Sequence, residues 1–155
     1  MGYELQAVIA GEVLRTEARQ LPEARLASIG QGLSLMPMTD ALLESVADGA
    51  ESDALGFWRL PEEFARTLAA WSTAGPVAYV ETEYFGGAGE QQAVVWDRGA
   101  IVLGPLHEPE GRSLPPEGSA ISRALRRLGV VAGDGEDEFA AVGLGRHRCV
   151  DDWIA

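Results

Sequence analysis

Apolar residues between positions 60 and 71 recur at the spacing of a helix. Pro61 suits a first helical turn, and Gly75-Pro76 is typical of the chain just beyond a helix end. We therefore predict a helix from about residue 61 to residue 74, with one apolar side in the core. That side consists of Leu60, Phe64, Leu68 and Trp71.

Strand-like patterns lie on both sides of this helix. Six short segments rich in apolar residues are separated by turn residues, at positions 3–9, 24–29, 32–36, 77–85, 91–97 and 100–104. A two-residue turn at 98–99 predicts a hairpin. Its expected pairs are Asp97–Ala100, Trp96–Ile101, Val95–Val102 and Val94–Leu103. Both faces of this hairpin are apolar, so we expect the sheet to be covered on both sides.

The remaining chain predicts four further helices and two loops. The helices are expected at about 12–20, from Thr39 or Asp40 towards Gly49, at 119–128 and around 139–142, and the loops at 49–56 and 104–118. The predicted fold is a single α+β domain over residues 1–155. Its mainly antiparallel sheet of about six strands carries helices packed against it, and two sub-sheets are the alternative. We expect residues 60–71 and 91–103 to supply most of the core.

The net charge of the chain indicates which classes of partner it attracts and which it repels. The 155 residues carry 24 acidic and 12 basic side chains, giving a net charge of −12, and every basic residue is Arg. An acidic surface repels nucleic acid and anionic membranes and attracts basic proteins. We therefore expect no nucleic-acid or membrane partner and consider a basic protein partner. Acidity that serves solubility alone is the alternative.

Cysteine usage and the N-terminal pattern indicate a cytoplasmic protein without a cofactor. Cys149 is the only cysteine, so an internal disulfide and a cysteine-clustered metal site are excluded. No apolar run approaches the length of a membrane span, and residues 5–14 lack the basic flank of a signal peptide. We expect no metal and no cofactor.

The segment 81–91, ETEYFGGAGEQ, is the most unusual stretch. Glu81 and Glu83 are two positions apart on a predicted strand, so they share a face with Tyr79 and Phe85. Such a carboxylate pair suits a divalent cation or an acid and a base. An exposed strand face with two solubilising charges is the alternative. The glycines at 86, 87 and 89 predict a hairpin connection, because a phosphate loop needs a Gly-Lys-Ser/Thr end and the chain has no Lys.

A second candidate lies at residues 143–148, GLGRHR. Arg146 and Arg148 after a small-residue turn suit an anion, whereas pairing with Asp151, Asp152 or the acidic run 134–138 is the alternative. His147 with Cys149 is a weak nucleophile pair, and a buried structural cysteine is the better interpretation. His107 joins Glu81, Glu83 and His147 in a remote metal hypothesis.

Two smaller features complete the candidates. Arg123, Arg126 and Arg127 form a basic patch on one predicted helix, too small for a nucleic-acid footprint. Trp58 and Trp153 lie near element ends, where a tryptophan can anchor an interface.

The stretches ETEYFGGAGEQQAVVW (81–96), Gly104-Pro105, AISRALRRLGV (120–130) and DEFAAVGLGRHR (137–148) resemble a family of small stand-alone actinobacterial proteins of no established activity. The resemblance spans roughly residues 76–153, with a looser similarity at 31–42. It implies a cytoplasmic bacterial setting and no catalytic residue. In type, though not in motif, the chain is similar to small acidic immunity proteins that neutralise toxins.

The first functional hypothesis is an acidic, immunity-like protein-interaction domain that inhibits a basic partner. Its candidate binding residues are Glu81, Glu83, Tyr84, Phe85, Gly87, Gly89, Gln91, Arg146, His147 and Arg148. A small hydrolase or isomerase that uses Glu81 or Glu83 with Arg146 or His147 is the second hypothesis. An anion-binding protein is the third, with Arg146, Arg148 and the glycine loops at its site.

Overall fold

The computed structural model describes residues 2–46, 56–85, 88–108 and 118–154. Its centre is one antiparallel sheet of six strands in the order β2-β3-β1-β4-β5-β6. The strands are β1 (Gly2–Ala10), β2 (Ala27–Ser28), β3 (Ser34–Pro37), β4 (Val77–Phe85), β5 (Ala88–Asp97) and β6 (Ala100–Glu108). The predicted α+β class is confirmed. The alternative of two sub-sheets is wrong, because β1 pairs with β3 on one side and with β4 on the other.

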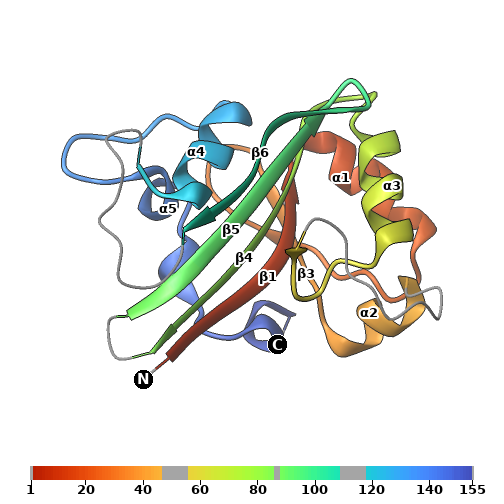
Figure 1. The fold of residues 1–155 in the computed structure, drawn as a ribbon, viewed down its shortest axis with the longest axis horizontal. Helices are drawn as coiled ribbons and strands as arrows, with labels where there is room; N and C mark the ends of the chain where they lie inside the picture. The colour runs from red at the N-terminus through yellow and green to blue at the C-terminus, as the bar shows by residue number, and fades with distance from the viewer. Residues whose placement is uncertain (1, 47–55, 86–87, 109–117, 155) are drawn as a thin grey trace.

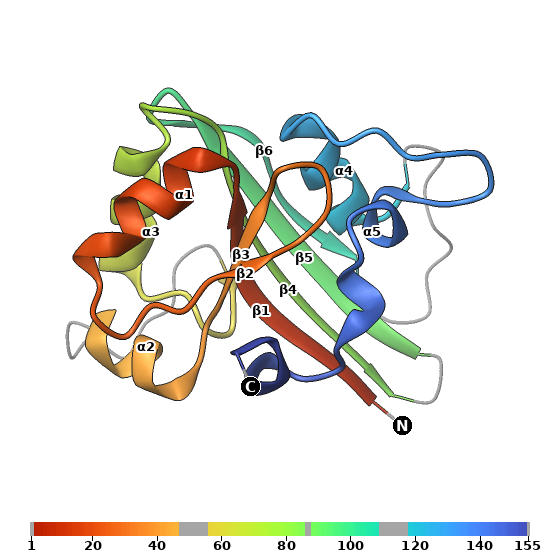
Figure 2. The same ribbon diagram turned by 180° about the vertical axis from the view of Figure 1, so that it is seen from behind.

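Helices cover both faces of the sheet, as Figures 1 and 2 show from opposite sides. On one face, here the α3 face, lie α1 (Glu12–Glu17), α2 (Asp40–Val46) and α3 (Glu62–Trp71). The opposite face, here the α4 face, carries α4 (Ala120–Arg127) and α5 (Glu138–Ala141). Short 3-10 segments complete the fold as η1 (Ala18–Gln20), η3 (Leu144–Arg146) and η4 (Val150–Ile154).

The two-residue period of the strands creates two separate cores. On β1, Leu5 and Ile9 pack on the α4 face, whereas Val8 packs on the α3 face. All three side chains are fully buried. Successive strand residues point to opposite faces, so one central strand serves both cores.

Helix α3 forms where the sequence predicts it. Pro61 precedes its first residue, and Glu62 and Glu63 place negative charge in the first turn, where the helix dipole favours it. Phe64 and Leu68 are buried against the sheet, and the Phe64 ring meets Trp71 edge-on at 6.0 Å. The helix therefore holds the chain just before it, residues 57–60, against the same sheet face.

The hairpin of β5 and β6 departs from the predicted register. Trp96 lies opposite Ile101 as expected, but Val95 pairs with Leu103 instead of Val102 because a bulge interrupts β6. Ile101 and Val102 are exposed, so within the predicted core segment 91–103 the buried residues end at Trp96. Leu103 packs on the α4 face instead of sharing a face with Trp96.

Two loop and strand boundaries also differ from the predictions. Strand β6 continues to Glu108 and so includes the first five residues of the predicted loop 104–118, and residues 109–117 lie outside the described chain. Most of the predicted loop 49–56 also lies outside it. The predicted strand 24–29 shrinks to the two residues of β2, which pair only with β3 at the sheet edge.

Leu68 provides a test of the α3 core. Its side chain is fully buried, so Leu68→Ala removes buried methyl groups and leaves a cavity. We expect the free energy of unfolding to fall by about 2–5 kcal/mol. Urea denaturation followed by tryptophan fluorescence measures it, and a loss below about 1 kcal/mol would contradict this packing.

Candidate functional site

The α3 face of the sheet changes from apolar to acidic along its strands. Three consecutive cross-strand rows of β1, β4 and β5 run from the helix-covered centre towards the end where β1 begins and β4 ends. The first row is apolar or aromatic, the second is buried and polar, and the third is entirely glutamate. In this order the rows are Val8–Tyr79–Val94, Gln6–Glu81–Gln92 and Glu4–Glu83–Glu90.

Glu81 lies in the buried row and is fully removed from solvent. Its carboxylate accepts hydrogen bonds from the backbone N–H of Trp58 at 2.5 Å and of Arg59 at 2.7 Å. The hydroxyl of Tyr79 donates a third at 2.7 Å. Burial of a charged group is costly unless it is hydrogen-bonded, so these donors make Glu81 an anchor for the segment before α3. The interpretation of Glu81 as an exposed solubilising charge is therefore wrong.

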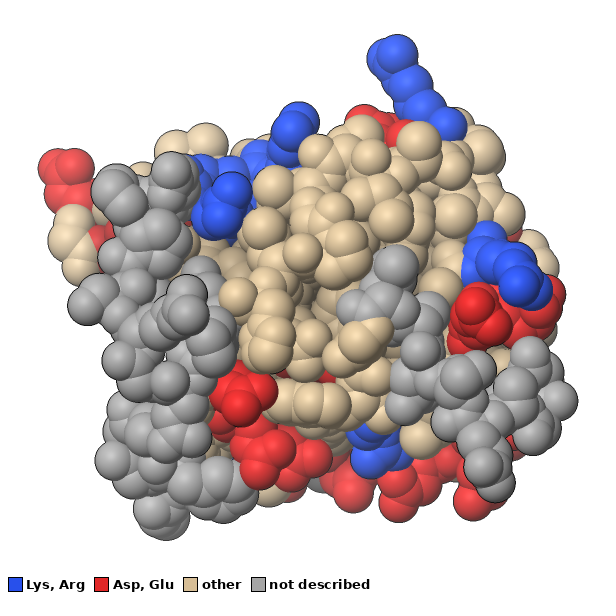
Figure 3. All heavy atoms as spheres, in the orientation of Figure 1, with Lys and Arg blue, Asp and Glu red and all other residues tan. Residues whose placement is uncertain are grey.

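The third row, Glu4, Glu83 and Glu90, is here called the acidic row. Glu83 lies directly opposite both neighbours, and its side chain and that of Glu90 are half-buried while Glu4 is exposed. The ring of His107 approaches only Glu90, at 3.5 Å from Nε2 to the carboxylate. Like charges directly opposite one another destabilise a sheet. Figure 3 shows acidic side chains gathered along this lower part of the molecule.

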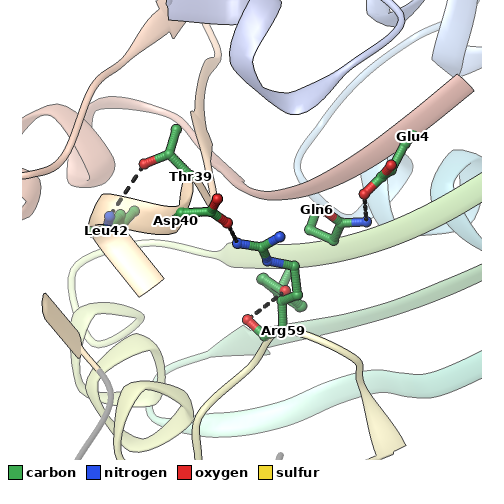
Figure 4. Close-up of polar contacts among 7 residues, drawn as sticks. Glu4, Gln6, Thr39, Asp40, Leu42 and Arg59 are labelled. Carbon is green, nitrogen blue, oxygen red and sulfur yellow. Dashed lines mark hydrogen bonds and ion pairs between the residues drawn. The ribbon is translucent and has the colours of Figure 1, made fainter. Parts of the chain in front are cut away.

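A hollow of about 150 Å³ lies beside the acidic row, between β1, the start of α2 and the C-terminal segment. Glu4, Asp40 and Asp151 line it together with Arg59, whose guanidinium pairs with Asp40 at 2.5 Å. Figure 4 shows Arg59 reaching towards Asp40, with Gln6 and Glu4 on the other side. Gln6 donates to Glu4 at 3.4 Å. Three carboxylates and one guanidinium leave the hollow with net negative charge.

Cys149 lines the same hollow and is exposed. A side-chain hydrogen bond with Asp152 raises the pKa of its thiol, and the negative charges of Asp152, Glu4 and Asp151 raise it further. Because the thiolate is the reactive form, this surrounding makes Cys149 a poor nucleophile at neutral pH. The prediction of a buried structural cysteine is nevertheless wrong, because Cys149 is exposed at the hollow instead of packed in a core.

Other predicted binding residues lie on the α4 face. The amide of Gln91 donates to the Tyr84 hydroxyl at 2.6 Å and accepts from the N–H of Ile121 at 3.0 Å, so it joins the sheet to α4. Gly89 lies opposite Tyr84, where a β-carbon would collide with the Tyr84 ring. Gly87 and the side chain of Phe85 lie outside the described residues.

Arg146 and His147 are also separated from the acidic row. The His147 ring meets Trp153 at 4.7 Å, and Trp153 packs in the core of the α4 face. The guanidinium of Arg146 lies over the Trp153 ring and donates to the carbonyl of Ser28 at 2.7 Å. The predicted pairing of Arg146 with nearby carboxylates is therefore wrong, because its guanidinium donates its hydrogen bonds to backbone carbonyl oxygens instead.

The structure therefore does not bring the two halves of the predicted enzyme site together. Glu83 faces the α3 side, whereas His147 lies on the α4 side. Arg148 contributes its carbonyl, which accepts from the N–H of Glu4 at 2.8 Å, and thereby fixes the C-terminal segment along the edge of β1. Among the described residues no group of three or more His, Cys, Asp or Glu is placed to hold a metal ion.

Sequence reasoning missed Glu4, Glu90, Asp40 and Arg59 as parts of the site. A signal for Glu4 was available, because Glu4 and Gln6 alternate with apolar residues at the start of the first strand. The pairing of that strand with residues 77–85 is a long-range contact that no local pattern encodes. Without it, the glutamates of three strands cannot be assigned to one row.

Comparison of the chain with protein-family models, curated proteins and solved structures finds no match. The resemblance to a small actinobacterial family therefore stays a prediction. Within the described residues, no helix combines the length and apolar character needed to cross a membrane.

Replacement of Glu81 tests its anchoring role. Glu81→Gln leaves an NH₂ group where the carboxylate accepts backbone N–H bonds, so one buried donor loses its partner. We expect unfolding to become easier by about 1–3 kcal/mol in urea denaturation. Glu83→Gln, on the same strand and face, is the matched control and should lower stability by no more than a few tenths of a kcal/mol. Equal losses in both variants would contradict the anchor.

The thiol of Cys149 reports the electrostatic potential of the hollow. Asp152→Asn removes a neighbouring negative charge and changes the hydrogen bond that raises the thiol pKa, so that pKa should fall. At pH 8 more thiolate forms, and alkylation by iodoacetamide should become faster. Asp134→Asn, which lies outside the residues that raise the pKa, should leave the rate unchanged. An unchanged or slower rate for Asp152→Asn would disprove this account.

Proposed function

We propose that this protein is a cytoplasmic interaction domain that binds a basic partner protein through its acidic row and the adjoining hollow. The mode of action is that of an immunity-like inhibitor, which covers a basic surface of its partner. The observation that carries the proposal is the acidic row itself: three glutamates on three adjacent strands of one face. In the described chain, the one basic side chain within ion-pair distance of the row is His107, beside Glu90.

The energetic cost of this row supports a functional role. Opposed like charges weaken strand pairing by roughly 0.2–1 kcal/mol per pair, and a stability-driven sequence would avoid them. A basic partner would offset the repulsion on binding. Complementary charge also speeds the encounter of two proteins and makes it sensitive to salt.

Trp58 gives the acidic surface an apolar neighbour. Its backbone N–H is bound by the carboxylate of Glu81, which lies in the row next to Glu83, while its side chain is 38% exposed. A tryptophan at the centre of an interface commonly carries much of the binding energy. A basic surface with an apolar centre therefore fits this site.

Affinity capture tests the proposal with matched charge variants. The tagged wild-type protein, a Glu83→Gln/Glu90→Gln variant and a Glu12→Gln/Glu23→Gln variant are incubated with extract of the native cells. Both variants lose two negative charges, but only the first changes the acidic row. We expect a basic protein to bind the wild type and the control, to bind the acidic-row variant at least about tenfold less, and to dissociate at high salt.

The stability of the acidic-row variant separates lost binding from lost folding. Because neutral glutamines relieve the repulsion, its unfolding midpoint should equal or exceed that of the wild type. If the captured protein is an enzyme, adding the wild-type chain should inhibit it. Recovery of no basic protein, or equal recovery by all three proteins at low and high salt, would contradict the proposal.

A further inference from the structure

An open groove of about 260 Å³ lies between α4 and β6, on the face opposite the acidic row. Arg123, Arg126 and Arg127 line it from α4, and Leu103 lines it from β6. The arginines are three and four positions apart, so one side of the helix presents all three. In a chain of net charge −12, the groove concentrates a quarter of the basic side chains.

Helix stability does not account for this arrangement. Arg126 and Arg127 lie in the last turn of α4, where the helix dipole favours positive charge. Arg123 lies in the first half of the helix and gains little from that effect. Its spacing from the other two instead produces repulsion between like charges, which destabilises a helix by a few tenths of a kcal/mol per pair.

The described residues leave much of this positive charge unpaired. Arg126 has a carboxylate partner, Glu138, at 3.6 Å, and Arg127 donates to the carbonyl of Val102 at 3.1 Å. Arg123 is half-buried, and its guanidinium makes no hydrogen bond or ion pair with the part of the chain that the structure describes. A guanidinium has five N–H donors in a fixed plane, so most donors around the groove remain available.

From this groove we infer an anion site that binds a phosphate group. A guanidinium group binds phosphate oxygens through paired, charge-assisted hydrogen bonds. Here three guanidinium groups on one side of a helix line the same small groove. The groove is smaller than the roughly 300–1,000 Å³ typical of sites that enclose a whole ligand. It therefore suits free phosphate or a phosphate monoester whose small apolar part rests on Leu103.

Titration with inorganic phosphate and with phenyl phosphate tests the site. Amide NMR shifts of the full chain are followed at constant ionic strength, with sodium chloride replacing the phosphate salt. We expect saturable shifts in α4 and at Leu103. Tighter binding of phenyl phosphate assigns a monoester as the ligand, because its ring covers Leu103, and equal affinities assign free phosphate.

Three variants decide whether the arginines form the site. Arg123→Gln should weaken binding about tenfold, as expected for loss of a charged hydrogen bond. Arg19→Gln removes an equal charge at an exposed position on η1 and should bind as the wild type does. Glu138→Gln removes the carboxylate that competes for Arg126 and should bind more tightly.

Because Arg and Gln have similar helix propensities, Arg123→Gln should keep the native amide spectrum. Shifts that do not saturate, or equal affinities of Arg123→Gln and the wild type, would overturn the proposal. So would weaker binding by Glu138→Gln. The acidic row lies on the other face, so these outcomes are independent of the basic partner proposed above.

Discussion

The buried carboxylate of Glu81 is the constraint on which one whole face of this structure depends. A charge without contact to water must receive hydrogen bonds, and the nearest donors are the backbone N–H groups of Trp58 and Arg59. Meeting that requirement fixes the chain that leads into α3 against β4. It also places the Arg59 side chain where it pairs with Asp40 at the start of α2. The position of the segment before α3 and the Arg59–Asp40 pair at the hollow are thus both consequences of Glu81 on β4.

The acidic row results from the same strand geometry. Its charges repel one another and destabilise the sheet, whereas the hydrogen bonds of Glu81 stabilise it. Glu83 is two residues beyond Glu81 and therefore shares its face, yet it is only half-buried and stands opposite two further glutamates. No helix packs apolar side chains on this row, in contrast to the row of Val8, within the described residues. One face therefore combines a covered centre that supplies stability and an uncovered end that weakens it, a pairing common at binding sites.

Local sequence patterns were sufficient to predict the helices and strands. Which residues form the site depends on the long-range pairing of those strands. The apolar spacing at 60–71 predicts α3, and alternation in residues 3–9 and 77–85 predicts β1 and β4. The same alternation shows that Glu81 and Glu83 share a face, but not that Glu81 is buried, because its cover comes from residues 57–60. His147 lies 64 positions after Glu83 in the sequence. Only the tertiary packing of Trp153 assigns His147 to the other face.

The bulge in β6 could not be predicted from local patterns either, since a hairpin turn fixes the register only for the pairs nearest to it.

The sheet also separates the charges of the molecule. The acidic row lies on the α3 face, and the arginines of α4 lie on the opposite face, with the buried side chains of β4 and β5 between them. Attraction between exposed charges falls off within roughly 8–10 Å at physiological salt, so the two groups cannot neutralise one another across the layers. Each group therefore keeps its own field, negative at the acidic row and positive at the arginines of α4. A net charge of −12 describes neither face, because the distribution of charge over the two faces, and not its sum, determines which molecules each face attracts.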